Sequence, residues 1–317
     1  MTRPRSTLVS LEETPYYHCI SRCVRRAFLC GQDRFTGKSF NHRKPWLVKR
    51  FRLLASVFVI DIAAYAVMSN HYHLVLHVDQ HRSRQWSKDD VIDRWLTLYK
   101  GPELMQRYKK REPLLPAERT KVLEIAQTWR DRLSSISWFM ACLNEHIARK
   151  ANAEDSCKGR FWEDRFKSKA LLDETALLAT MAYVDLNPVR AGIARNLKES
   201  SFTSIQERIR EVADHHTKNR PPLMAFSESR TLADGIVTLP FHLKDYIELV
   251  DWTGRIVRRD KRGFIAATEP RILKSLKLTE QDWEYLALAI HKRSINTIHG
   301  LERLKAHKNQ QPETQAA

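Results

Sequence analysis

Two histidines separated by one tyrosine, His71-Tyr72-His73, lie inside an apolar run at residues 66–76. The apolar residues that follow the second histidine are typical of a buried β-strand. Side chains alternate between the faces of a strand, so His71 and His73 point the same way, with Cα atoms about 7 Å apart. Two imidazoles at that spacing can bind one divalent ion, while Tyr72 faces the core. Because two ligands are only part of a metal site, another segment must supply the rest.

The apolar pattern of the whole chain predicts an α+β fold. The order strand, helix, strand, strand, helix, strand, helix favours an antiparallel sheet with helices packed on it. The hairpin is the clearest unit, because its two strands are joined by a tight turn at Asn70. Asp173 is a typical N-cap for the last helix. The expected strands are 15–20, 57–68, 71–78 and an extended segment at 159–171, and the expected helices are 33–55, 134–150 and 173–186.

Two further parts of the chain fall outside this order. Residues 80–132 are highly charged and predict a helical insertion. Residues 206–317 predict a mostly helical C-terminal extension, in which no motif indicates a role. The main domain is therefore expected over residues 10–205, with the insertion inside it.

The net charge of +17, from 54 Lys and Arg against 37 Asp and Glu, is concentrated near the N-terminus. Residues 1–60 alone hold 12 basic and 3 acidic residues. This concentration favours contact with nucleic-acid phosphates over the alternative, a solvated basic surface.

Neither a membrane nor an oxidising compartment is indicated. The chain has no run of about 18 apolar residues, which argues against a membrane span. The first residues lack the apolar core of a signal peptide, and the spacing of the five cysteines fits no disulfide framework. We therefore expect a cytoplasmic protein with reduced thiols.

The segment at 158–169 interleaves basic and aromatic residues. Arg and Lys can follow a phosphate backbone while an aromatic side chain stacks on an unpaired base. Trp162 is the stacking candidate, whereas Phe161 and Phe166 fit a buried position equally well. The basic candidates are Arg160, Arg165, Lys167 and Lys169.

A second chemical segment begins at Tyr183. Asn187 follows four residues later, so the two side chains lie on one helical face, one turn apart. A tyrosine hydroxyl can attack a phosphodiester as a covalent nucleophile, and an amide oxygen can bind a metal. Tyr183 taken alone also fits a packed aromatic residue. His77 has the strand parity of His73 but lies about 13 Å along the strand, too far to share an ion.

Four features, in order, resemble one protein family. Residues 68–74 (MSNHYHL) resemble the HUH motif (His, bulky hydrophobic residue, His), and residues 183–192 (YVDLNPVRAG) resemble the tyrosine motif of single-tyrosine HUH transposases. Within that family the resemblance is closest to the REP-associated tyrosine transposases. Residues 159–168 (GRFWEDRFKS) resemble their basic Trp–Arg–Phe–Lys segment. Tyr17-His18, followed by Arg22 and Arg26, resembles the first strand of these transposases. The resemblance therefore covers about residues 10–200.

This resemblance implies a ferredoxin-like HUH nuclease core and a DNA transposase that cleaves and rejoins single-stranded DNA at hairpins or palindromic repeats. His71, His73 and Asn187 would hold Mg²⁺ or Mn²⁺. Tyr183 would attack the DNA and leave a 5′-phosphotyrosine and a free 3′-hydroxyl. Asn187 stands where other branches carry Gln or Glu, so a loosely bound metal is expected. The residues expected to bind DNA are Arg22, Arg25, Arg26, Arg160, Trp162, Arg165, Lys167, Lys169 and Arg190.

Two alternative functions also fit parts of the sequence. A domesticated, catalytically weak DNA- or RNA-binding protein would keep the fold and the basic surface. A zinc-dependent hydrolase is disfavoured, because no carboxylate or cysteine stands near either motif in the usual ligand spacing. The sequence fits a monomer or a homodimer, and the position of Tyr183 relative to the histidines separates an enzyme from a binding protein.

Overall fold

The computed structural model describes residues 9–24, 29–32, 37–213, 223–227, 235–256, 270–290, 297–298 and 300. A sheet of order β2-β3-β1-β4-β5 lies at its centre. The first four strands in chain order pair antiparallel, as predicted, while the two-residue β5 joins β4 in parallel. The strands are β1 (Tyr16–Arg22), β2 (Ile60–Val67), β3 (His71–Val78), β4 (Lys167–Leu171) and β5 (Thr297–Ile298).

Two helices cover one face of this sheet. Helix α1 (Lys44–Val57) connects β1 to β2, and α6 (Ile136–Glu154) lies between β3 and β4 and packs against α1. This order of strands and helices is ferredoxin-like, as predicted. Tyr72 points into this core as predicted, and its hydroxyl donates a hydrogen bond to Oδ1 of Asn144 (2.6 Å).

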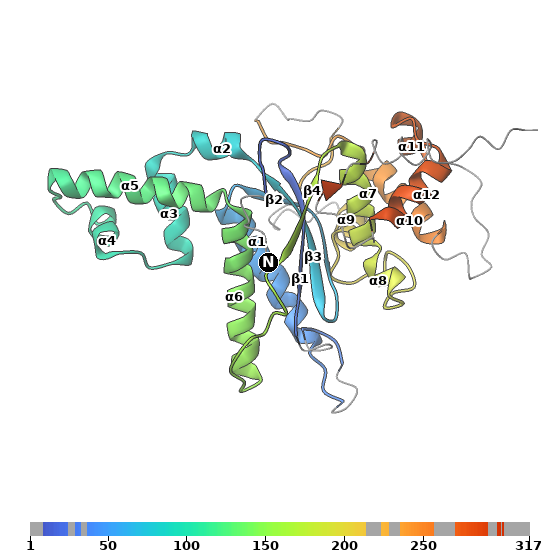
Figure 1. Cartoon of the computed structure of the whole chain (residues 1–317), viewed down its shortest axis with the longest axis horizontal. Helices are drawn as coiled ribbons and strands as arrows, with labels where there is room; N and C mark the ends of the chain where they lie inside the picture. Colours follow the sequence, from blue (N-terminus) through green and yellow to red (C-terminus); the bar gives the residue numbers. More distant parts are fainter. Residues whose placement is uncertain are drawn as a thin grey trace, which may run out of the picture.

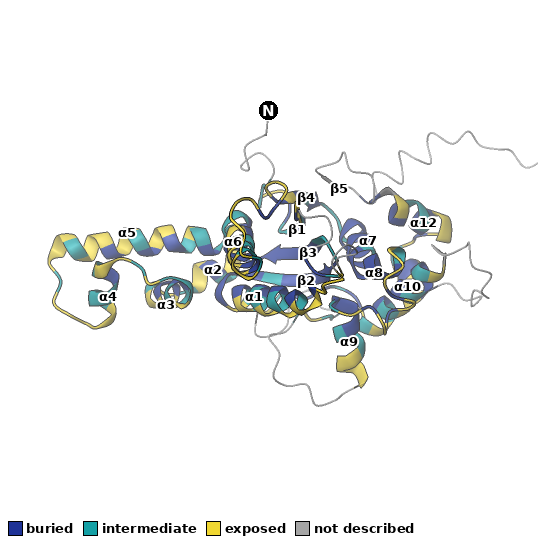
Figure 2. Cartoon of the chain, turned by 90° about the horizontal axis from the view of Figure 1, so that it is seen from below, coloured by how far each residue is buried: buried dark blue, intermediate teal, exposed yellow. Residues whose placement is uncertain are grey.

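Helix α7 (Glu174–Asp185) covers the other face (Figure 1). The predicted cap is present, because Oδ1 of Asp173 accepts a hydrogen bond from the amide of Ala176 (2.7 Å). C-terminal helices pack on α7 from the side away from the sheet, so nearly the whole of α7 is buried (Figure 2). The helices after α7 are α8 (Asn187–Arg190), α9 (Ser204–Ala213), α10 (Leu243–Ile256), α11 (Arg271–Ser275) and α12 (Glu280–Ala289).

The predicted insertion is helical and forms an arm that projects from one side of the sheet (Figure 1). Its core is aromatic, with the rings of Trp95 and Trp129 stacked at 5.5 Å between centroids. The helices of this part are α2 (Gln80–Gln85), α3 (Lys88–Leu98), α4 (Glu103–Lys109) and α5 (Pro116–Leu133).

Two predicted elements are shorter than expected. The helix expected over 33–55 is α1, which begins at Lys44 after a short 3₁₀ turn η2 (Asn41–Arg43), and Pro45 in its first turn favours a start there. Residues 33–36 of this prediction lie outside the described residues. The extended segment at 159–171 contributes β4 over its last five residues, where β1 offers backbone partners. None of the helices in the described ranges is both long and apolar enough to cross a membrane.

Candidate active site

His71 and His73 lie on β3 and face α7, as strand alternation predicted. Their rings are 4.8 Å apart between centroids and nearly perpendicular. His73 is almost fully buried, whereas His71 at the start of the strand is partly exposed. The histidine pair is therefore accessible to solvent from the N-terminal end of β3.

A third histidine completes the cluster. His18 on β1 is buried, and its Nε2 lies 2.9 Å from Nδ1 of His73. The pairing register explains this contact: Ile20 lies opposite His73, so strand alternation places His18 on the same face of the sheet. From the sequence, His18 contributed only to the family resemblance. Its alternation with Ile20 and Arg22 is the signal that could have identified it.

His71 and His73 are both held through Nδ1. Nδ1 of His71 lies 2.7 Å from Oδ1 of Asn70, a carbonyl oxygen that accepts, so His71 donates this bond. Its Nε2 then carries a lone pair. Nε2 of His73 is buried and has no hydrogen-bond partner among the described residues. Two imidazole nitrogens of the kind that bind metals thus lie on one face of β3.

Burial keeps the cluster uncharged. It lowers the pKa of His18 to about 3, with the nearby charge of Lys169 adding to the effect. It lowers the pKa of His71 to about 4, aided by Arg22, and it lowers the pKa of His73 well below its ordinary value. At neutral pH these imidazoles are neutral, and a metal meets no competing proton.

These shifts predict how the free energy of unfolding depends on pH. In the unfolded chain the pKa of His18 is about 6.5, so between about pH 6.5 and 3 the unfolded chain binds more protons than the folded one. The free energy of unfolding is therefore unaffected by His18 above that window and falls as pH drops through it. Urea denaturation should show a smaller loss between about pH 7 and 4 for His18→Gln than for the wild type, by roughly 3 kcal/mol. Equal losses in the two proteins would contradict the shift.

Tyr183 meets the histidines within one chain. Its ring lies edge-on to His73 and His18, at 5.8 and 6.2 Å between centroids. The guanidinium of Arg190 lies over the same ring at 5.3 Å. A phenol, neutral imidazoles and a cation are thus brought together from strands β1 and β3 and from the segment at α7 and α8.

Asn187 begins α8, one turn after Tyr183. Its Nδ2 donates hydrogen bonds to the carbonyls of Tyr183 (3.0 Å) and Val184 (3.4 Å). Two carbonyl acceptors fix the orientation of the amide, which leaves Oδ1 as the atom available to a metal. The predicted helix break before Pro188 is present, because α7 ends at Asp185 and α8 begins at Asn187 with Pro188 in its first turn, but Leu186 between them keeps a helical conformation.

The donor set fits a weakly held divalent ion. No cluster of three or more His, Cys, Asp or Glu side chains that could hold a metal occurs in the described part of the chain. Two neutral imidazole nitrogens, including the unpartnered Nε2 of His73, and one amide oxygen can provide part of a coordination sphere. Water and a substrate oxygen would complete it.

The basic residues predicted to bind DNA differ in how exposed they are. Arg22 ends β1 opposite His71, and it is exposed. Lys169 lies opposite His18 on the histidine face, is half-buried and donates to the carbonyl of Ile290 (3.4 Å). Arg25 and Arg26 lie outside the described residues. The other exposed members are Arg160, Arg165 and Lys167.

The structure contradicts the predicted role of Trp162 as a base-stacking residue. Trp162 is only 9% exposed, packs edge-on against Tyr72 and donates its indole N–H to the carbonyl of Asn144 (2.8 Å). Phe161 and Phe166 are buried as well. The aromatic residues of this segment therefore anchor it to the core. The sequence pattern did not reveal this, because interleaved aromatic and basic residues also occur in a segment that covers an apolar face.

A buried polar network fixes the C-terminal end of α7. The carboxylate of Asp185 accepts hydrogen bonds from the hydroxyl of Ser204, the amide of Ile205 (2.9 Å) and the hydroxyl of Tyr246 (2.6 Å). Arg208 is also fully buried nearby, and burial raises the pKa of Asp185 despite this cation and these donors. The network ties the tyrosine helix to α9 and α10.

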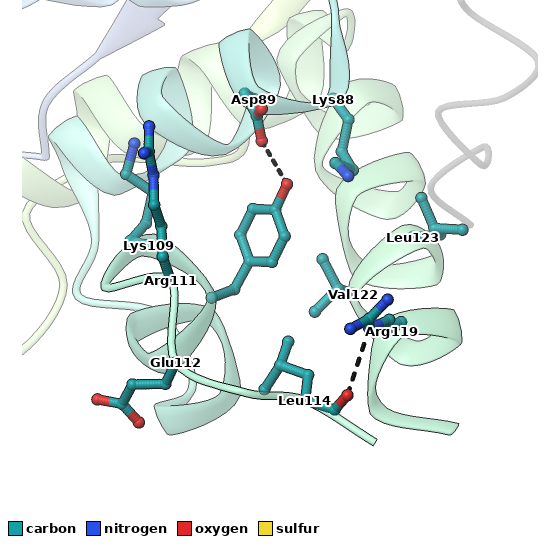
Figure 3. A pocket seen from close by; sticks show the side chains of 10 residues that line it. Lys88, Asp89, Lys109, Arg111, Glu112, Leu114, Arg119, Val122 and Leu123 are labelled. Carbon is teal, nitrogen blue, oxygen red and sulfur yellow. Dashed lines mark hydrogen bonds between the residues drawn. The ribbon is translucent and has the colours of Figure 1, made fainter. Parts of the chain in front are cut away.

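The arm contains a cavity that is separate from the histidines. Figure 3 shows this cavity, of about 620 Å³, between α3, α4 and α5, with the hydroxyl of Tyr108 donating to Asp89 (2.6 Å). Its lining contains four basic and two acidic residues and no histidine. The lining residues are Lys88, Asp89, Tyr108, Lys109, Arg111, Glu112, Leu114, Arg119, Val122 and Leu123.

Comparisons with known proteins gave one structural similarity and no match in sequence. No family model matches the chain, and no curated protein matches it. The fold is similar to a solved structure of a REP-associated tyrosine transposase bound to a REP hairpin, with 11% identity and a TM-score of 0.36. The similarity covers 63% of this chain and 82% of the other.

Proposed function

We propose that this protein is a metal-assisted tyrosine transposase that cleaves and rejoins single-stranded DNA. The observation that carries the proposal is the contact between Tyr183 and the His18–His73 pair within one chain. The proposed nucleophile thus lies next to buried neutral imidazoles, although the two segments are about 110 residues apart in sequence. A protein that only binds nucleic acid would not require this arrangement.

The proposed reaction exchanges one phosphodiester for another. The phenol oxygen of Tyr183 forms a bond to phosphorus, and the bond from phosphorus to the 3′ oxygen breaks. The phenol loses its proton and the leaving oxygen gains one, so the products are a 5′-phosphotyrosine and a free 3′-hydroxyl. The reverse reaction with a new 3′-hydroxyl rejoins the strand without an external energy source.

His71, His73 and Asn187 are the proposed metal ligands. When bound, the ion would polarise the scissile phosphate and stabilise negative charge on its oxygens. Two imidazoles and one neutral amide favour Mn²⁺ over Mg²⁺, since imidazole is a poorer ligand for the harder ion. The ligand set adds no negative charge, so the affinity should be modest.

Cations at the open end of the site would position the DNA. Arg22 lies across from His71, and Arg190 lies over the ring of Tyr183. Each cation that contacts a phosphate adds salt-dependent affinity without reading the base. We therefore propose hairpin or single-stranded DNA as the substrate class, in keeping with the sequence motifs. Tyr183 would act in its own chain, because α7 packs on the same chain's sheet.

Removing a metal ligand tests the proposal. With a labelled hairpin oligonucleotide and Mn²⁺, His73→Ala and His71→Ala should lower the cleavage rate roughly 1,000-fold or more, because the metal contributes several kcal/mol of transition-state stabilisation. DNA binding should change less than about threefold, since phosphate contacts supply most of the affinity. Cleavage is measured on gels and binding by fluorescence anisotropy.

His77→Ala is the matched control. His77 is a buried histidine of the same strand and face, but its Nδ1 lies 3.3 Å from a carboxylate oxygen of Asp61, away from Tyr183. Its replacement should leave the cleavage rate per folded molecule unchanged. Wild-type cleavage that persists in EDTA would refute the metal role. Hairpin binding with no cleavage under any divalent ion would favour a protein that only binds nucleic acid.

A further inference from the structure

The hydrogen bond between His18 and His73 joins two neutral imidazoles. Both rings are buried, and they stack at 5.1 Å between centroids with an interplanar angle of 21°. A neutral imidazole has one N–H and one bare nitrogen, so one ring must donate and the other accept. The choice decides which atom of His73 faces the site.

The two possible tautomers have different chemical consequences. If His18 donates from Nε2, then Nε2 of His73 carries a hydrogen and cannot bind a metal. If Nδ1 of His73 donates to His18, then Nε2 of His73 carries a lone pair. In the second case His73 matches His71, whose Nδ1 donates to Oδ1 of Asn70. The two histidines of the motif would then present equivalent nitrogens.

We propose that His18 is a positioning residue that accepts a hydrogen bond from Nδ1 of His73 and thereby presents Nε2 of His73 to a divalent cation. This inference rests on the proposed function, because it assumes that His73 binds a metal. His18 is not itself proposed as a ligand: among the described residues it forms no metal-binding cluster with His71 and His73, and its Nε2 is already bonded. An acceptor behind a ligating histidine fixes its tautomer and ring orientation.

The position of His18 in the sheet suits this role. Its strand is central, paired with β3 on one side and β4 on the other. The side chain is therefore fixed between two strands and beneath the ring of Tyr183. Asn70, the corresponding acceptor for His71, lies in the hairpin turn just before the strand. One proposed ligand is thus oriented from the central strand of the sheet and the other from the hairpin turn.

The first test reads the tautomer directly. Long-range ¹H–¹⁵N correlation spectra of the full chain with ¹⁵N-labelled histidine distinguish an Nδ1–H imidazole from an Nε2–H imidazole, and a His73→Gln variant assigns the signals. We expect the Nδ1–H form for His73 in the metal-free protein. The Nε2–H form would overturn the inference.

The second test measures Mn²⁺ affinity, by calorimetry or electron paramagnetic resonance, in the full chain. His18→Leu keeps the apolar volume but removes the acceptor, and we expect the dissociation constant to rise about 10–100-fold. His18→Gln offers an amide oxygen near the position of Nε2 and should restore affinity to within about threefold of the wild type. Rescue by Gln separates a hydrogen-bond role from a packing role, and it keeps the test decisive if His18→Leu does not fold. His77→Leu is the control and should leave the dissociation constant unchanged.

The outcomes separate this inference from the proposed function. If the wild type binds Mn²⁺ and both His18 variants bind equally well, the positioning role is wrong and the metal site stands. If His18→Gln binds as weakly as His18→Leu, the acceptor role is wrong. If the wild type binds no Mn²⁺, even with a hairpin oligonucleotide present, the metal-assisted function itself fails.

Discussion

Tyr183→Phe is expected to abolish the covalent protein–DNA adduct and to lower cleavage roughly 10,000-fold or more, because it removes the only atom that forms the new bond to phosphorus. The phenylalanine ring can keep the edge-on contacts with His18 and His73 and the position under Arg190. Hairpin affinity and the free energy of unfolding should therefore stay close to wild type, the latter within about 1 kcal/mol. Denaturing gels with a labelled hairpin measure the adduct.

Tyr16→Phe is the matched control for this prediction. Tyr16 lies on the same face of the sheet as His18 and His73, but its ring contacts His77, at 4.7 Å between centroids. This variant should form the adduct at the wild-type rate. Adduct that survives Tyr183→Phe would mean that another tyrosine is the nucleophile.

Asp185→Ala is expected to give the largest loss of stability, about 3–5 kcal/mol in the free energy of unfolding. The change leaves the hydroxyls of Ser204 and Tyr246 and the amide of Ile205 without their buried acceptor. It also removes one of the negative charges near the buried guanidinium of Arg208. Urea denaturation measures the loss, and cleavage should fall with it, because the network holds the helix that carries Tyr183.

A double variant shows whether the loss comes from an uncompensated charge. Asp185 and Arg208 are buried groups of opposite charge that attract each other. Replacing both by apolar side chains costs less than removing one, because burial disfavours both charges. Asp185→Leu combined with Arg208→Met should therefore be more stable than the sum of the two single changes implies, by at least about 1 kcal/mol. Additive losses would show that the two groups do not depend on each other.

The core of the fold was predictable from local patterns. The alternation from His71 to His73 predicted β3 and the face to which its side chains point, and Asp173 predicted the start of α7. Both signals are local, since they depend on short-range periodicity or on capping. The boundaries that were misjudged depend on partners distant in sequence. The segment before Lys167 looks extended and basic, yet β4 begins only where β1 is available to pair with it.

The site was only partly predictable for the same reason. His71, His73, Tyr183 and Asn187 stand in two compact motifs, so each could be identified locally. His18 meets His73 through pairing between β1 and β3. Trp162 was assigned to the surface although it belongs to the core, since interleaved aromatic and basic residues do not show which of the two faces solvent. Asp185 could not be distinguished from a surface carboxylate, because its partners Ser204, Ile205 and Tyr246 are about 20 to 60 residues away in sequence.

Mapping the covalent adduct by mass spectrometry tests the central claim most directly. The wild-type protein is incubated with a hairpin oligonucleotide and Mn²⁺, and the adduct is digested with nuclease and trypsin. The tryptic peptide 170–190 contains Tyr183 as its single tyrosine. We predict that this peptide carries the 5′-phosphonucleotide on Tyr183. An adduct on a different residue, or cleaved DNA with no adduct on any peptide, would contradict the proposed mechanism.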